Sequence, residues 1–256
     1  MEATPALRLV NSYYDEELFG GYQLQDKIGF FNVGLWKDDC DSIEMAQLIL
    51  LETLVRFFES SGSTVLDVAC GKGASTKYLT KYFSGKRITG INISEMQLEV
   101  CRVMAPECDF RLMDATRMAF SDATFHNILC VEAAFHFVTR HGFLQEAFRV
   151  LVEGGRLAMS DMLFGRDAEN VTPTLFPVNA IEGIEEYRSL LLEVGFRKVR
   201  IEDTTRWALL PLLDHMEARI EKDLEFVSEI ERNRLREECR SFRKLNPVCC
   251  NVFAIK

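Results

Sequence analysis

Two titratable side chains, Glu132 and His136, close an otherwise apolar run, "FHNILCVEAAFHFV". A buried charge is unfavourable by several kcal/mol unless it is paired, so we expect this run to be a strand that emerges at the rim of a ligand cleft. A histidine near its ordinary pKa can accept a proton at neutral pH. Asp161 ends a second apolar run, "RLAMSD", and is the carboxylate that we expect near His136.

A glycine turn follows a third apolar run in "VLDVACGKGAST". Glycines at 71 and 73 allow a tight turn and close approach of a ligand, and the free N–H groups of a following helix favour acceptor atoms. A dinucleotide site would need glycine or alanine at position 76 and an acidic residue at position 92, where this chain has Thr76 and Asn92. An NAD-dependent oxidoreductase is therefore the weaker alternative. Asp67, buried before the turn, suits an amino-acid-like ligand.

These motifs lie on alternating strands and helices, which predicts an α/β fold with a parallel sheet and helices on both faces. We expect a helix in "IEGIEEYRSLLLEVGF", ended by Gly195. The expected strands are 64–70, 87–93, 109–114, 126–132, 155–161, 198–204 and 251–256.

Two amphipathic helical regions, about 42–59 and about 208–243, lie outside this alternation. They either cover the sheet edges or form a lid together with "LFGGYQLQDKIGFFNVGLW", and we favour the lid. Aromatic side chains in regions expected near the pocket mouth favour a hydrophobic acceptor. These are Phe19, Tyr22, Phe30, Phe31, Trp36, Phe164, Phe176 and Trp207.

Composition narrows the classes of partner. The 256 residues are 48% hydrophobic with a formal net charge of −9, which favours one large core and argues against nucleic acid and anionic membranes. No apolar stretch approaches ~20 residues and the start lacks a signal peptide, so we expect no membrane insertion and a cytoplasmic location. The eight cysteines are expected to be reduced and mostly packed, and the histidine spacing predicts no metal site. A homodimer stays open.

Four ordered motifs resemble the class I S-adenosylmethionine-dependent methyltransferases: Asp67-x-x-x-Gly71-x-Gly73, "ITGINISEMQ", "DATRMAFSDATF" and "FRVLVEGGRLAMSD". The chain is most similar to the branch that acts on sugars, sterols, quinones and other natural products. The resemblance covers about 62–204 and implies a doubly wound Rossmann-like sheet of seven strands, mostly parallel with an antiparallel last strand. It divides a single domain into an N-terminal cap (1–61), the core, a helical lid (205–248) and the last strand (249–256).

The resemblance also implies roles for individual residues. Asp67 and the turn would hold the methionine part of S-adenosyl-L-methionine, the acidic ribose position is an amide here, and Asp114 with Ala115 would read adenine. Glu132 and Ala133 would face the cofactor or the acceptor. The implied cofactor set is Asp67, Ala69, Cys70, Gly71, Gly73, Asn92, Ile93, Gln97, Asp114, Ala115, Glu132 and Ala133. Cys70 replaces a glycine common in the family, and His126 an aspartate.

The reaction that the resemblance implies is methyl transfer to a small molecule, with a hydroxyl acceptor ahead of carbon or nitrogen. We expect His136 to be the base and Asp161 to orient it or the acceptor. Three alternatives stay open: His136 as a packing residue, Asp67 as a core carboxylate and Asp114 as a turn cap. A cofactor-binding module without turnover is a further one. Phe135 replaces the glutamate of cyclopropane synthases, which disfavours cyclopropanation, and Tyr13 and Tyr14 are placed to close over the cofactor.

Overall fold

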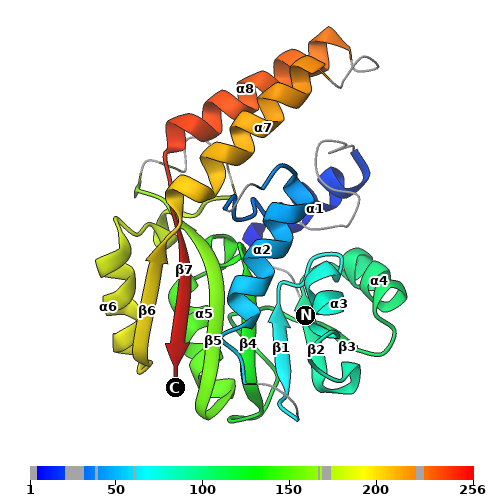
Figure 1. The fold of residues 1–256 in the computed structure, drawn as a ribbon. Coiled ribbons are helices and arrows are strands. Elements are labelled where there is room, and N and C mark those ends of the chain that lie inside the picture. Colours follow the sequence, from blue (N-terminus) through cyan, green and yellow to red (C-terminus); the bar gives the residue numbers. More distant parts are fainter. Residues whose placement is uncertain are drawn as a thin grey trace.

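One seven-stranded sheet forms the centre of the protein, in the order β3-β2-β1-β4-β5-β7-β6 (Figure 1). The computed structural model describes residues 5–20, 32–37, 40–59, 62–166, 168, 174–222 and 228–256, without the side chains of 16–20, 222, 231 and 238. The strands are β1 (Val65–Val68), β2 (Ile88–Asn92), β3 (Asp109–Leu112), β4 (Phe125–Val131), β5 (Leu151–Leu163), β6 (Arg197–Asp203) and β7 (Val248–Ile255).

Chain direction within the sheet confirms the expected fold class. β1 pairs in parallel with β2 and β4, and β2 with β3 and β4 with β5 are parallel too. β7 runs antiparallel to both β5 and β6, as the resemblance implied for the last strand. The order of strands reverses between β1 and β4, and ligands of doubly wound sheets bind beyond the carboxyl ends of the strands at such a switch point.

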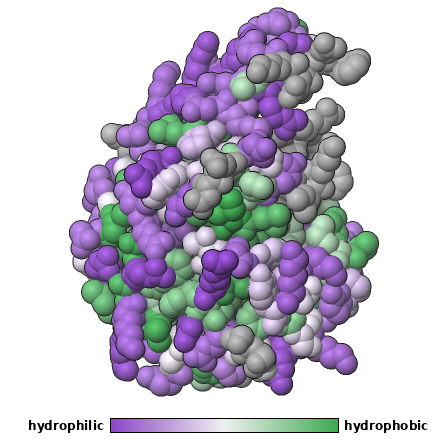
Figure 2. Space-filling view, viewed as in Figure 1, coloured by the Kyte–Doolittle hydropathy of each residue, from purple (hydrophilic) through white to green (hydrophobic). Residues whose placement is uncertain are grey.

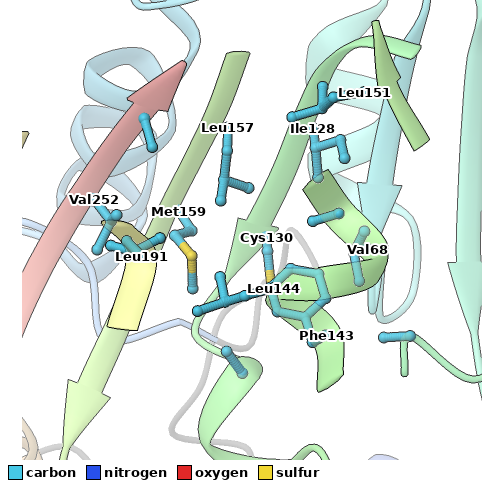
Figure 3. Packing of buried hydrophobic residues seen from close by; sticks show 14 of the residues in the cluster. Val68, Ile128, Cys130, Phe143, Leu144, Leu151, Leu157, Met159, Leu191 and Val252 are labelled. Carbon is cyan, nitrogen blue, oxygen red and sulfur yellow. The ribbon is translucent and has the colours of Figure 1, made fainter. Parts of the chain in front are cut away.

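Helices cover both faces of the sheet. α2 (Ile43–Val55), α3 (Ala74–Leu79) and α4 (Glu95–Met104) lie on one face, and α5 (Arg140–Val150) and α6 (Ile184–Val194) lie on the other. Figure 3 shows how α5 and α6 pack: Phe143, Leu144 and Leu191 meet strand residues such as Ile128 and Met159. This apolar layer holds the strands so that their carboxyl ends stay at one edge.

Local signals set several helix ends. The hydroxyls of Ser42, Ser94 and Thr139 accept hydrogen bonds from backbone N–H groups in the first turns of α2, α4 and α5. Gly195 ends α6 with a left-handed φ of 117°, as its sequence context predicted. The cap of α4 and that of α5 also fix the start of each helix close to the cavity described below.

The regions expected to form a lid take different places. α2 packs on the sheet face against β5, so the expectation that about 42–59 belongs to a lid is wrong. The region 208–243 is a hairpin of α7 (Leu209–Lys222) and α8 (Glu229–Leu245) that projects beyond the carboxyl edge of the sheet (Figure 1). Its ion pairs join Arg236 to Glu221 and Arg243 to Asp214, and its outer surface is mostly hydrophilic (Figure 2).

The N-terminal segment forms a helix that no sequence signal had singled out, α1 (Pro5–Gly20). It lies at the same edge of the sheet as the hairpin (Figure 1). Short 3-10 turns complete the fold: η1 (Gly85–Arg87), η2 (Ala134–His136), η4 (Pro177–Asn179) and η5 (Thr205–Trp207). Among the described residues, no helix is long and apolar enough to cross a membrane.

Candidate active site

A cleft opens at the switch point, beyond the carboxyl ends of β1 to β4, and holds about 780 Å³ of space that includes open solvent. Its walls combine strand ends with α1: Leu7, Val10, Asn11, Tyr14, Ala69, Gly71, Ile91, Asn92, Ile93, Gln97, Met113, Asp114, Ala115, Val131, Glu132, Ala133, His136 and Phe137. Asp67, Cys70, Gly73 and Asp161 are the expected site residues outside this lining.

The turn after β1 presents backbone to the cavity. Ala69 has a positive φ of 56°, and Gly71 and Gly73 have φ of 55° and 88°. A Cβ at Gly73 would lie 3.1 Å from the Cα of Cys101, so only glycine lets α3 and α4 approach this closely. Cys70 points into the interior, with its Sγ 4.0 Å from that of Cys101. Gly73 and Cys70 therefore shape the turn from behind.

Asp67 is a buried carboxylate, as one sequence alternative proposed. The hydroxyls of Ser75 and Thr76 donate to its Oδ2 at 2.7 and 2.6 Å. Burial raises its pKa to about 6, against the lowering effect of the two hydroxyls. Asp67 thus ties β1 to the first turn of α3 and fixes the glycine turn between them.

Asn92 and Gln97 form a polar corner after β2. The amide of Asn92 donates to the Gly71 carbonyl at 3.2 Å and to Gln97 Oε1 at 2.9 Å, which joins the ends of β1 and β2. Asp15 of α1 accepts hydrogen bonds from Ser94 Oγ at 2.8 Å and from Gln97 Nε2 at 3.3 Å. The corner therefore also docks α1 over the cavity.

Asp114 lies at the end of β3 with one oxygen committed locally. Its Oδ1 accepts from the backbone N–H and the hydroxyl of Thr116, at 2.8 and 2.9 Å. This is the turn cap that the sequence left open, and Asp114 together with Ala115 also lines the cavity. The cap orients the carboxylate, so a binding role and a capping role coexist at this residue.

Glu132 directly follows β4 with a left-handed φ of 48°, just as Ala69, also with a positive φ, directly follows the neighbouring β1. Non-glycine residues at positive φ carry strain of about 1–3 kcal/mol and cluster at ligand sites. Glu132 Oε2 accepts from the Val33 N–H at 2.8 Å, which links the strand end to the N-terminal segment. Removal of this side chain from bulk water raises its pKa to about 8.

His136 lies in η2 with both ring nitrogens occupied. Nδ1 lies 3.0 Å from the Thr174 carbonyl, which can only accept, so Nδ1 carries the ring proton. Nε2 then accepts from the Tyr14 hydroxyl at 2.7 Å. The pKa of His136 is lowered to about 4, mainly by burial and also by the charge of Arg140, against the raising effect of the Thr174 hydrogen bond. The ring is neutral at pH 7, with its basic nitrogen on the side of α1.

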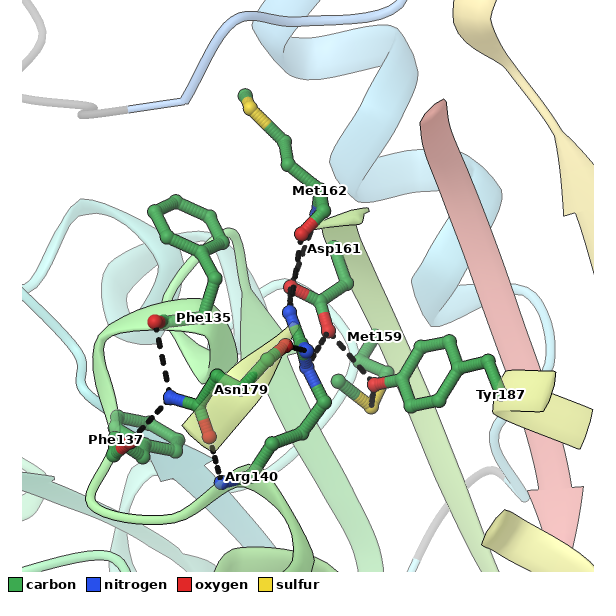
Figure 4. A network of polar contacts seen from close by, with 8 residues as sticks. All are labelled: Phe135, Phe137, Arg140, Met159, Asp161, Met162, Asn179 and Tyr187. Carbon is green, nitrogen blue, oxygen red and sulfur yellow. Dashed lines mark hydrogen bonds and ion pairs between the residues drawn. The ribbon is translucent and has the colours of Figure 1, made fainter. Parts of the chain in front are cut away.

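The expected pairing of Asp161 with His136 is wrong. Asp161 Oδ2 accepts from Arg140 Nε at 2.9 Å and from the Tyr187 hydroxyl at 2.7 Å (Figure 4). Its Oδ1 accepts from the Met162 N–H at 2.9 Å. The pair with Arg140 is wholly buried. Asp161 lies near the end of β5, and its partner Arg140 begins α5, directly after the loop that carries His136.

Of the residues that α1 contributes, the sequence had singled out Tyr14, through the resemblance, but not Leu7, Val10 or Asn11. Leu7, Val10, Asn11 and Tyr14 lie at helical spacing, and all four line the cavity. Pro5 at the first helical position with this i, i+3, i+4, i+7 pattern is the signal that would have found them. The Asn11 side-chain oxygen is buried without a hydrogen-bond partner among the described residues. A ligand that donates a hydrogen bond would satisfy it.

The aromatic residues expected at the pocket mouth do not line this cavity where they are described. Phe164 and Phe176 line a smaller neighbouring pocket of about 240 Å³, and Phe135 separates that pocket from His136. Trp36 and Trp207 line neither pocket, and the Trp36 N–H donates to the Trp207 carbonyl at 2.6 Å. The side chains of Phe19, Tyr22, Phe30 and Phe31 lie outside the described residues.

Comparisons with known proteins match this geometry. A family described as "Methyltransferase domain" matches residues 66–159. The O-methyltransferase resE of Aspergillus sclerotiorum is 30% identical over 217 residues, 79% of this chain and 81% of that protein. An O-methyltransferase of Pyrenophora dematioidea is 32% identical over 190 residues, 68% of this chain and 71% of that protein.

A solved structure supports the fold. The geranyl diphosphate C-methyltransferase of Streptomyces coelicolor, in complex with Mg²⁺, geranyl-S-thiolodiphosphate and S-adenosyl-L-homocysteine, superposes with a TM-score of 0.76 at 17% identity. The match covers 100% of this chain and 99% of that chain.

Proposed function

Because the chain belongs to the methyltransferase domain family, we propose that it transfers a methyl group from S-adenosyl-L-methionine to a hydroxyl of a neutral, largely apolar small molecule. The membership confirms that the protein is a methyltransferase of the small-molecule branch and leaves the oxidoreductase alternative without support. The observation that carries the hydroxyl assignment is the Tyr14 hydroxyl held on the neutral His136 nitrogen at the cavity wall.

The cavity fits the cofactor. Backbone of the turn at Ala69 and Gly71 faces it, the Asp114 carboxylate faces it from β3, and the Asn11 oxygen supplies an unused acceptor. The amino group, ribose hydroxyls and adenine of the cofactor offer donors for these groups. When bound, S-adenosyl-L-methionine supplies an electrophilic methyl group on a positively charged sulfur.

The charge of the lining supports a neutral acceptor. Among the described lining residues there is no lysine or arginine, and the ionisable acids are Asp114 and Glu132. A phosphorylated or carboxylated acceptor would find no cationic side chain among these residues to pair with it. This lining is suited to an uncharged acceptor with large apolar surface, whereas the Streptomyces coelicolor structure holds a diphosphate compound with Mg²⁺.

His136 is the group that we assign to the acceptor proton. As the new bond to the methyl carbon forms, the acceptor oxygen becomes positive and its proton strongly acidic, so even a neutral imidazole of low pKa accepts that proton. The Thr174 carbonyl keeps the ring in the tautomer with a free lone pair on Nε2. We infer that the acceptor hydroxyl takes the place of the Tyr14 hydroxyl on this nitrogen.

The test is methyl transfer from labelled cofactor to uncharged polyketide, terpenoid and sugar alcohols, with the product bond assigned by NMR. His136→Ala is expected to lower kcat by ~10²–10⁴-fold, the usual contribution of a general base, with little change in cofactor binding. His126→Ala is the matched control, because His126 is an exposed histidine on β4 that contacts Thr64. Methylation on carbon or nitrogen, or full turnover by His136→Ala, would refute the assignment.

The pH profile separates His136 from Glu132 as the base. A base with the pKa of about 4 of His136 gives a kcat/KM that is flat from pH 6 to 8. A base with the pKa of about 8 of Glu132 gives a kcat/KM that falls tenfold per pH unit below that value. A falling limb that Glu132→Gln abolishes would transfer the role of base to Glu132.

Other expectations also remain proposals. We propose a single domain in which the N-terminal cap, apart from α2, and the 205–248 insertion enclose the acceptor, a cytoplasmic location, and no nucleic-acid partner. The net charge of −9 supports the last. Light scattering of the purified protein would show whether it forms a homodimer. Retention on heparin or a nucleic-acid column at physiological salt would contradict the proposed lack of a nucleic-acid partner.

A further inference from the structure

Asn179 is the hub of the buried network in Figure 4, and this network contacts the loop that carries His136. Its Nδ2 donates to the carbonyl of Phe135 at 3.1 Å and to that of Phe137. Its Oδ1 accepts from the Arg140 N–H at 2.7 Å. One side chain thus holds the backbone on both sides of His136, and all of its polar atoms serve that loop.

Arg140 anchors the same loop to the sheet. Its guanidinium is bonded to Asp161, to the Met162 carbonyl at 3.0 Å and to the Asn179 carbonyl. Tyr187 of α6 donates to the same carboxylate. These side chains are almost fully buried, so the network is dry and its donors are matched to acceptors. A buried network of this kind fixes geometry more than it adds stability.

We propose that Asn179 is a positioning residue for methyl transfer: it fixes the loop of His136 against the Arg140–Asp161 pair and so aims the imidazole at the acceptor. The inference rests on the proposed function of His136 and assigns to Asn179 no contact with substrate. It also explains why 174–181 lies against η2, since Thr174 orders the His136 ring and Asn179 orders the backbone of Phe135 and Phe137 on either side of it.

The network also controls the charge state of the ring. The groups that act on His136 are the Thr174 carbonyl, the Tyr14 hydroxyl from α1 and the guanidinium of Arg140 from α5. Burial and Arg140 both lower its pKa. If the Phe135 and Phe137 carbonyls are released from Asn179, the loop can move the His136 ring toward water and away from Arg140. The pKa of His136 then rises toward the ordinary value of about 6.5.

The experiment is NMR titration of ¹³Cε1-labelled histidine, with the His136 signal assigned from the His136→Ala variant. In Asn179→Ala, we expect the His136 midpoint to rise by about one pH unit or more, and kcat to fall by about tenfold with KM for S-adenosyl-L-methionine unchanged. Asn127→Ala is the matched control, because Asn127 is a buried asparagine that bonds Glu59 backbone at the other end of β4. It is expected to leave the midpoint unchanged.

A folded Asn179→Ala protein with an unchanged His136 midpoint and unchanged kcat would overturn the proposal. If Asn179→Ala does not fold, Tyr187→Phe removes one donor to Asp161 and should shift the midpoint in the same direction by a smaller amount. The titration is independent of catalysis. Full turnover by His136→Ala with a shifted midpoint in Asn179→Ala would therefore refute the proposed function while leaving the positioning of the loop intact.

Discussion

The two halves of the cavity are built by contacts of different range. At the ends of β1, β2 and β3, most polar contacts join near neighbours, such as Asp114 to Thr116 and Asp67 to Thr76, and Asp15 of α1 adds long-range bonds to Ser94 and Gln97. At the ends of β4 and β5, side-chain contacts between elements join residues 21 to 122 positions apart, from Asp161 with Arg140 to His136 with Tyr14. The cofactor half is built mainly from local turns, whereas the acceptor half depends on tertiary packing.

This difference also separates stability from binding. The acceptor half contains a fully buried ion pair and a neutral histidine, whose geometry requires several distant elements at once. The cofactor half uses mainly turn residues whose partners are close in the chain, such as Asp67 with Thr76 and Asp114 with Thr116. Substitutions in the acceptor half should therefore affect folding and turnover, and those in the cofactor half should affect cofactor affinity.

The largest expected effect on stability is at Arg140. Arg140→Met leaves the Asp161 carboxylate buried without its cation, and removal of one partner of a buried pair lowers the free energy of unfolding by ~3–5 kcal/mol. Denaturant unfolding followed by circular dichroism measures it. Arg197→Ala breaks an exposed pair with Glu153 and should change that free energy by less than about 1 kcal/mol. Equal losses of unfolding free energy in Arg140→Met and Arg197→Ala would contradict the expected difference between the buried and the exposed ion pair.

A smaller effect, confined to binding, is expected at Asp114. Loss of hydrogen bonds to a charged group weakens binding by about 1.5–3 kcal/mol, so Asp114→Ala should raise the Kd for S-adenosyl-L-methionine by about 10–100-fold. Isothermal titration calorimetry gives the Kd. The control is Asp109→Ala, at the other end of β3, where the carboxylate is half exposed and paired with Arg111. An unchanged Kd for Asp114→Ala would leave its turn cap as its whole role.

Glu132 makes stability depend on pH in the acceptor half. Its pKa is raised from 4.5 to about 8 in the folded protein, so unfolding releases a proton between these values and stability falls as pH rises from about 4.5 to 8. Glu132→Gln keeps the acceptor for Val33 N–H and removes the charge. Relative to the wild type, its free energy of unfolding should rise by about 3 kcal/mol between pH 5.5 and 8.5. If the unfolding free energies of the two proteins change in parallel with pH, Glu132 has an ordinary pKa in the folded protein. Asp67 titrates in both proteins, so its contribution is the same in both curves.

The range of contacts explains what the sequence could predict. The strands, the glycine turn and the ends of β2 and β3 follow from patterns within about ten residues, such as the run from Asp67 to Thr76. The structure brings Ala69, Gly71, Asn92 and Asp114 together in one cavity. Turn chemistry and periodicity are local properties, so a sequence contains them directly.

The acceptor half could not be predicted to the same depth. Asn179 ends the short turn η4, in a stretch without a regular sequence pattern. Its bonds to the loop of His136 form only when 174–181 packs against η2, and its partner Phe137 lies 42 residues earlier in the chain. Asp161 was matched to His136 because both follow strand ends, yet the strand end alone does not say which buried cation the carboxylate meets. Pairing of charges in a core is decided by packing, which no spacing in the chain specifies.

The smallest expected effect concerns Cys70, which departs from the glycine common in the resembling enzymes. Its sulfur packs behind the turn against Cys101 and Gly90, in the cofactor half but away from the cavity. Cys70→Ala should therefore lower the free energy of unfolding by about 1 kcal/mol through a small cavity, with the Kd for S-adenosyl-L-methionine unchanged. Cys70→Gly should lose a further ~0.5–1 kcal/mol from backbone freedom. A Kd that rises in Cys70→Ala would instead place this sulfur in the binding surface and show that local turns alone do not define the cofactor half.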